Sequence, residues 1–250
     1  MILTRENYHS KEANQKYMSA SQFKDFMECE SYAMAKINGD WVEEPSVPML
    51  VGSYVDAHFS NEMDLFKAKN PEIFKKDGNL KSQFLQANDI IARIERDDMM
   101  MRYLSGQTQV IKIGEISGIP FKTRIDSYHP GIAIVDLKIM RDMFPVWKGG
   151  ERLSFVEAWG YDIQGAIYRE SEGNNLPFIL AVATKENTCN IALLSVPEER
   201  LAYCIEEVRS LAPRYHEIKQ GVTEASRCGQ CDWCRHTKVL TEVIDYSEVM

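Results

Sequence analysis

Long apolar runs, glycine and proline are all scarce in this sequence. Its 250 residues include 14 glycines and 9 prolines, without an evident repeat or low-complexity segment, which excludes collagen-like and largely disordered proteins. No run of about 18 apolar residues exists, so no membrane span is predicted. Residues 1–10 are polar and lack the apolar core of a secretory signal. We therefore expect a cytoplasmic protein.

Positive charge is also in short supply. The chain has 29 Lys and Arg against 37 Asp and Glu, a formal net charge of −8, which argues against a protein that coats nucleic acid without specificity. An enzyme that contacts DNA through a local basic surface is not excluded. Residues 110–152 hold seven basic and five acidic side chains. This surplus predicts such a surface, although ordinary sampling also produces one of that size.

The 44% hydrophobic content is enough for one sizeable core. Apolar periodicity and turn residues predict an α/β fold, with a mixed central sheet flanked by helices and a helical N-terminal part. Predicted helices cover 18–37, 49–66, 80–104, 155–170 and 197–219, and predicted strands cover 109–113, 119–127, 132–139, 178–184 and 189–195. We expect a lead-in at 1–17, loose over its first ten residues, one domain at 18–238 and an acidic tail at 239–250.

Two aspartates and a lysine lie on the strands on either side of a predicted tight turn. Asp126 ends one strand, and Asp136 and Lys138 lie on the next. Because side chains alternate along a strand, Asp136 and Lys138 share one face, and a hairpin can bring Asp126 beside them. Two carboxylates form a site for a hard cation such as Mg²⁺ or Mn²⁺, and the Leu137 carbonyl is a further candidate ligand. The alternative is a salt-bridged surface strand.

Cleavage of a phosphodiester needs these residue types. A carboxylate-held metal ion activates water and relieves charge on the phosphate, and a lysine stabilises the charge that develops on phosphorus. Asp126 followed by Asp136-Leu137-Lys138, with nine residues (127–135) between the aspartates, resembles the signature of the PD-(D/E)XK nuclease superfamily. The resemblance implies a restriction-endonuclease-like core and a metal-dependent DNA hydrolase.

Further motifs resemble the RecB-like branch of that superfamily. Gln164 and Tyr168 match its Q-x-x-x-Y element and share a helix face, which implies that they support the site, unless they are ordinary helix-surface residues. The segment 52–56 falls where that branch often has Gly-x-x-x-His. Here the fifth residue is Asp56, with His58 two residues later, and we favour Asp56 as the third ligand.

Cysteines are concentrated near the end of the chain. Cys228, Cys231 and Cys234 are spaced C-x-x-C-x-x-C, a pattern typical of metal or cluster ligands. The resemblance to AddB-like and Cas4-like nucleases implies that Cys29 is the fourth ligand, although the third clustered cysteine follows sooner than is usual there. A [4Fe–4S] cluster, Zn²⁺ and an empty thiol cluster remain open.

Overall the chain resembles the phage and prophage exonucleases similar to exonuclease VIII, the RecE nuclease domain. This resemblance implies an exonuclease that resects double-stranded DNA ends for recombination, with a single-strand annealing protein as partner and with ring-shaped oligomers among related enzymes. The alternatives are an endonuclease or Cas4-like DNA end trimmer, and a non-catalytic Zn or Fe–S nucleic-acid-binding module.

Overall fold

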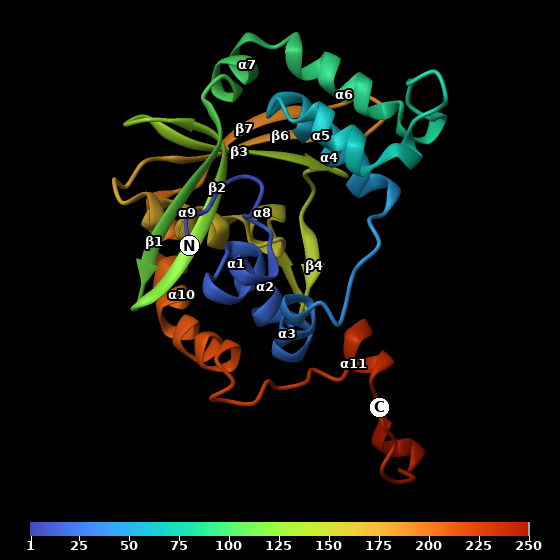
Figure 1. Cartoon of the computed structure of the whole chain (residues 1–250), viewed down its shortest axis with the longest axis vertical. Helices are drawn as coiled ribbons and strands as arrows, with labels where there is room; N and C mark the ends of the chain where they lie inside the picture. The colour runs from blue at the N-terminus through green and yellow to red at the C-terminus, as the bar shows by residue number, and fades with distance from the viewer. Residues whose placement is uncertain (250) are drawn as a thin grey trace.

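The computed structural model describes residues 1–249 and is organised around one five-stranded mixed sheet (Figure 1). Its strands are β1 (Gln107–Ile116), β2 (Ile119–His129), β3 (Ala133–Met140), β6 (Phe178–Thr184) and β7 (Ile191–Ser195), in the order β1-β2-β3-β6-β7. Strands β3 and β6 are parallel and the other neighbours are antiparallel. The predicted mixed central sheet is confirmed.

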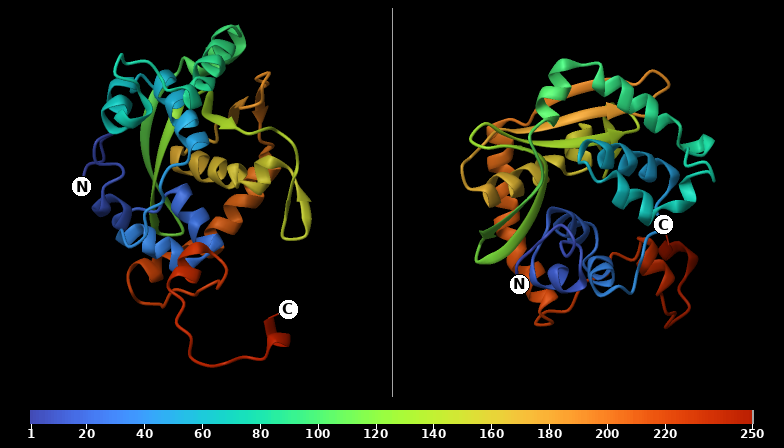
Figure 2. Two further views of the ribbon diagram at one scale, coloured as in Figure 1. Left: turned by 90° about the vertical axis from the view of Figure 1, so that its right-hand side faces the viewer. Right: turned by 45° about the horizontal axis from the view of Figure 1, so that its top comes forward.

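Helices cover both faces of this sheet (Figure 2). On one face lie α2 (Ala20–Glu28), α9 (Tyr161–Glu172) and α10 (Glu198–Lys219); on the other lie α4 (Val47–Phe59), α6 (Gln86–Glu95) and α7 (Asp98–Leu104). The remaining helices are α1 (Lys11–Lys16), α3 (Glu30–Asn38), α5 (Met63–Lys69), α8 (Phe155–Ala158) and α11 (Asp232–His236), with short 3-10 turns at Pro71–Ile73, Ser82–Phe84 and Tyr246–Val249. Strand β3 is central and largely buried, as its β-branched sequence predicts.

In the structure, four of the predicted helices are each divided into shorter helices. The helix predicted at 18–37 divides into α2 and α3 because Cys29 has an extended backbone, with φ −165°. The helix predicted at 80–104 is divided into the separate helices α6 and α7. Asp97, between them, accepts a hydrogen bond from the Met100 N–H and caps α7. The segment predicted at 155–170 divides at Gly160, whose φ is +60°, and 49–66 divides into α4 and α5.

A second, two-stranded sheet was not predicted. Strands β4 (Val146–Lys148) and β5 (Glu151–Leu153) form a hairpin. Two glycines connect them, Gly149 and Gly150, with φ of +60° and +84°, a conformation that favours glycine over other residues. Three residues per strand are too few for the alternation of polar and apolar side chains to be recognised in the sequence.

Two large apolar side chains at the ends of predicted elements are exposed. Ile132 is 68% exposed because it lies in the turn that precedes β3, and Trp159 is 52% exposed because it follows the end of α8. The first ten residues are also less loose than predicted, because Tyr8 is buried and its hydroxyl donates to the Lys122 carbonyl. Among residues 1–249, no helix combines the length and apolar character needed to cross a membrane.

Candidate active site

The predicted hairpin of β2 and β3 brings the three signature residues together. Regular pairing between these strands covers Ser127–His129 with Ala133–Val135 and then stops, so the strands separate beside the acidic residues. In this gap the Leu137 N–H donates to Asp126 Oδ2 at 3.0 Å. Because the N–H and C=O of one strand residue point to the same side, the Leu137 carbonyl also points to the side of β3 that faces β2.

Asp136 lies at the centre of this arrangement and is 1% exposed. Its Oδ1 accepts a hydrogen bond from Gln164 Nε2 at 2.6 Å, and its Oδ2 lies 2.5 Å from Lys138 Nζ as an ion pair. Lys138 is therefore the charged partner that this buried carboxylate needs.

Helix α9 supplies the predicted glutamine and tyrosine to the same site. Gln164 contacts Asp136 on β3, while the Tyr168 hydroxyl donates to the Arg124 carbonyl on β2 at 3.1 Å. Tyr168 is held in its neutral form because burial raises its pKa well above the ordinary value, with the charge of Asp136 adding to the shift. These two side chains therefore contact both strands of the hairpin at the site.

Helix α4 contributes Asp56 but not His58. Asp56 lines the same cavity as Asp126 and Asp136. The His58 ring is outside that lining, and its Nε2 lies 2.9 Å from Glu95 Oε1 on α6. The structure thus places Asp56 beside the other two aspartates, whereas the ring of His58, the alternative third ligand, points to a different helix and already has a carboxylate partner.

The three carboxyl groups disfavour one another's ionisation. Burial raises the pKa of Asp126 well above its ordinary value, and the charges of Asp136 and Asp56 add to the shift. Burial likewise raises the pKa of Asp56 to about 6, with Arg124 opposing the shift and Asp136 adding to it. For Lys138, burial acts to lower the pKa, but the Asp136 and Asp126 carboxylates outweigh it and hold the pKa above the ordinary value.

A cavity of about 580 Å³ opens onto these groups. The basic side chains that line it are Lys24, Arg124, Lys138 and Lys185. The sequence interpretation had not placed Lys24 or Arg124 in the site, although Arg124 precedes Asp126 by two residues and strand alternation puts both on one face. The cavity is also lined by the carboxylates of Asp56, Asp126 and Asp136, and carboxylates are the oxygen donors that a hard divalent cation prefers. The residues present fit such an ion.

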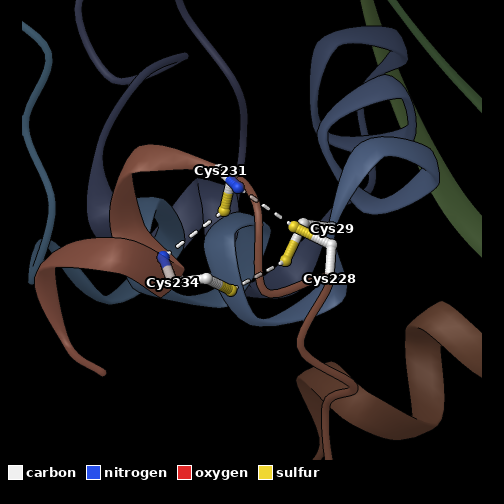
Figure 3. A group of neighbouring side chains, drawn as sticks. All are labelled: Cys29, Cys228, Cys231 and Cys234. Atoms are coloured by element: carbon white, nitrogen blue, oxygen red, sulfur yellow. Dashed lines mark hydrogen bonds between the residues drawn. The ribbon is translucent and has the colours of Figure 1, made fainter. Parts of the chain in front are cut away.

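The four predicted cysteines form a second cluster (Figure 3). The sulfur atoms of Cys29, Cys228, Cys231 and Cys234 all lie within 4.8 Å of one another, and those of Cys29 and Cys234 are 3.6 Å apart. Cys29 stands at the break between α2 and α3, and Cys234 lies on α11. The remaining two cysteines, Cys189 and Cys204, are not part of this group.

The electrostatics of this cluster suit a thiolate site. The pKa of Cys228 is lowered to about 6 because its sulfur accepts hydrogen bonds from the N–H groups of Cys231 and Gln230. Burial raises the pKa of Cys231 to about 12, so a bound cation would be needed to keep this second thiol deprotonated. Four convergent sulfurs fit a tetrahedral metal ion or a cluster.

Direct contacts also attach the C-terminal segment at this cluster. Trp233 on α11 donates to the Ser31 hydroxyl on α3 at 2.9 Å. Glu30 accepts from the Ser226 N–H at 2.8 Å and forms a two-point contact with Arg214, at 2.6 and 2.9 Å. The cluster therefore joins the first helices to the chain that follows α10.

Comparison with known proteins agrees with this fold and hairpin. Residues 19–237 match a family model described as a PDDEXK-like domain of unknown function (DUF3799). The crystal structure of a protein described as "Putative exonuclease" from Eubacterium rectale is 47% identical, with a TM-score of 0.93, covering 100% of this chain and 98% of that chain.

A second solved structure, described as SSO0001, is 14% identical with a TM-score of 0.29, covering 76% of this chain and 83% of that chain. No curated protein matches the chain. The family match and the similarity to the Eubacterium rectale protein support a nuclease. This chain belongs to the PDDEXK-like family DUF3799, and hence to the PD-(D/E)XK nucleases in fold.

Proposed function

We propose that the protein is a metal-dependent deoxyribonuclease that resects double-stranded DNA ends. The observation that carries the proposal is that Asp126, Asp136 and Lys138 line one cavity, where Asp136 is buried and paired with Lys138. Perturbed ionisable groups that meet in a cleft are the usual mark of a catalytic site. The relative described as a putative exonuclease supports the choice of reaction class.

The proposed metal ligands are the carboxylates of Asp56, Asp126 and Asp136, together with the Leu137 carbonyl. Bound there, Mg²⁺ or Mn²⁺ would supply charge relief on the phosphate and a lowered pKa for water. The chain's own groups do the rest. Lys138, protonated because of its two acidic neighbours, donates hydrogen bonds to the attacking water and to the phosphate oxygens as negative charge builds on them.

Gln164 and Tyr168 have positioning roles in this proposal. The amide of Gln164 fixes the orientation of the Asp136 carboxylate, and the Tyr168 hydroxyl holds the β2 backbone at Arg124. Arg124 and Lys24, which line the same cavity, provide positive charge for the DNA backbone. The site thus has a basic lining in a protein that is acidic overall.

Replacing Lys138 tests the proposal most directly. We expect Lys138→Ala to lower Mg²⁺-dependent DNA digestion by about 100- to 1,000-fold, because a preorganised donor to the developing charge is lost. Lys75→Ala, at an exposed lysine outside the cavity, is the matched control. Full digestion by a folded Lys138→Ala protein would refute the assigned role.

The biological role follows from the resemblance to phage exonucleases. We infer action in the cytoplasm, in phage-type recombination, with a single-strand annealing protein as partner and an oligomeric assembly. Digestion of linear DNA but not of covalently closed circles is expected for an exonuclease. Cleavage of both would instead identify an endonuclease or a Cas4-like end trimmer.

We further propose that the four cysteines bind a metal centre, and we favour Zn²⁺. Zinc–sulfur bonds of about 2.3 Å in a tetrahedron place sulfur atoms about 3.8 Å apart, close to the observed separations of 3.6 Å to at most 4.8 Å. A [4Fe–4S] cluster needs its four ligands further apart. Metal analysis and the visible absorption spectrum of anaerobically purified protein decide between zinc, iron with sulfide, and neither.

A further inference from the structure

The β4–β5 hairpin presents two different faces. It packs against α8, and in Figure 2 (left) its tip projects away from the rest of the molecule. Its inner face holds half-buried Val146 and Leu153 as well as Lys148, whose Nζ donates to the Ala158 carbonyl at 3.2 Å. Because side chains alternate along a strand, Trp147 lies on the outer face, directly opposite Arg152 in the hairpin register.

The outer face combines a large aromatic surface with a free positive charge. Trp147 is 73% exposed, and Phe144, just before β4, is 68% exposed. Arg152 is exposed and forms no ion pair or side-chain hydrogen bond in the part of the chain that the structure describes. A two-stranded hairpin gains little stability from a tryptophan pointing into solvent, and two exposed aromatic side chains only three residues apart indicate a binding surface.

The hairpin is connected to the candidate active site in both sequence and space. Residues 141–145 lead directly from β3, which carries Asp136 and Lys138, to β4. A second hollow of about 350 Å³ lies beside the hairpin, lined by Lys148 and Trp159 among others. This hollow shares Ser21 and Lys24 with the catalytic cavity. The two hollows therefore adjoin, and the second one reaches the inner face of the hairpin at Lys148, with the outer face on the other side of the same two strands.

We propose that the outer face of this hairpin binds unpaired DNA next to the catalytic cavity. The face of a base stacks on Trp147, with Phe144 as a second aromatic surface, and Arg152 contacts the adjoining phosphate. Aromatic side chains beside positive charge are the general means of binding single strands, whereas the bases of an intact duplex already stack on one another. The proposal rests on the nuclease function proposed above and gives the site a contact to single-stranded ends.

Binding experiments in a chelator separate this contact from catalysis. The probes are a fluorescein-labelled single-stranded oligonucleotide and a blunt duplex of the same sequence, followed by anisotropy. We expect Trp147→Ala to weaken single-strand binding by about 5- to 100-fold, the usual effect of losing one stacked base. Duplex binding should change far less, and Trp147→Phe should retain most of the single-strand affinity.

The arginine is tested by salt dependence. We expect Arg152→Ala to lower the slope of log affinity against log salt by about one, as for one lost phosphate contact, while Arg152→Lys keeps the slope. Tyr203→Ala is the matched control, since Tyr203 is an exposed aromatic on α10 that lines neither hollow.

Three results would overturn the inference: unchanged single-strand binding by folded Trp147→Ala protein, an equal loss for duplex, or an equal loss in Tyr203→Ala. Digestion of the same DNA by the unaltered protein in Mg²⁺ is measured in parallel. If digestion occurs but Trp147→Ala binds normally, only the hairpin inference fails. If Trp147→Ala loses single-strand binding but no digestion occurs, the nuclease proposal fails instead.

Discussion

The two candidate metal sites differ in what holds them together. The carboxylate site lies within the core, where Asp136 contacts Gln164 and Asp126 contacts the Leu137 amide. The cysteine site lies where two ends of the chain meet, and Cys228 is exposed. A site made by the sheet should persist without its ion. A site made between chain ends should depend on its ion.

The largest expected effect is that of Asp126→Asn, which should change activity and stability in opposite directions. Digestion should fall by about 1,000-fold or more, because a charged metal ligand is lost. In a chelator, however, the variant should have a higher Tm, because repulsion among three buried carboxylates is relieved while the amide oxygen still accepts from Leu137. Activity assays and thermal unfolding measure the two effects. A lower Tm than the unaltered protein would contradict our account of the site's electrostatics.

For Cys29→Ser we expect a loss of structural protection rather than a gain in stability. This change should abolish metal binding by the cysteines and make residues 225–237 more open to proteolysis, since direct contacts such as those of Trp233 and Glu30 would then have to hold that segment without the metal. Cys204→Ser, at a buried cysteine outside the cluster, is the control. Limited proteolysis with mass spectrometry gives the readout. Equal protection in the two variants would mean that the metal does not fasten this segment.

A smaller effect is expected from Glu30→Gln. Its two-point contact with Arg214 holds the pKa of Glu30 at about 2, but Arg214 is half exposed and regains water when the pair is broken. We therefore expect a loss of about 1–2 kcal/mol in the free energy of unfolding, measured by urea denaturation. The exposed pair of Arg209 and Glu206 provides a control, and Glu206→Gln should change stability less.

The smallest expected effect is on pH dependence and concerns Lys219. Burial, with the charge of Lys122 adding to it, lowers its pKa from the ordinary 10.5 to about 7. Between these pH values the unfolded chain binds more protons than the folded one, so this lysine makes the free energy of unfolding rise as pH increases from about 7 to 10. Urea denaturation across this range should show a shallower rise for Lys219→Met. An unchanged slope would contradict the low pKa.

The sequence contained most of what specifies the core site. Alternation along β3 predicted that Asp136 and Lys138 share a face, and the turn at 129–131 predicted that β2 returns beside them. Helical spacing placed Gln164 and Tyr168 together. These patterns are local, and a hairpin or one helical turn converts them directly into proximity.

Features that depend on long-range packing were not predictable in the same way. The break at Cys29 has no glycine or proline to signal it, and Cys29 Sγ meets a sulfur 205 residues later in the chain. Whether Asp56 or His58 faces the cavity depends on how α4 lies on the sheet, which periodicity does not specify. Lys24 joins the cavity for the same reason, through the position of α2.

The early end of pairing between β2 and β3 has a consequence for how this family can change. The Leu137 amide has no partner on β2 and is satisfied by the side chain of Asp126. An alanine at position 126 would therefore leave a buried donor without an acceptor. A relative that had lost catalysis could replace this acid with asparagine more easily than with an apolar residue, so inactive descendants should keep an oxygen at that position.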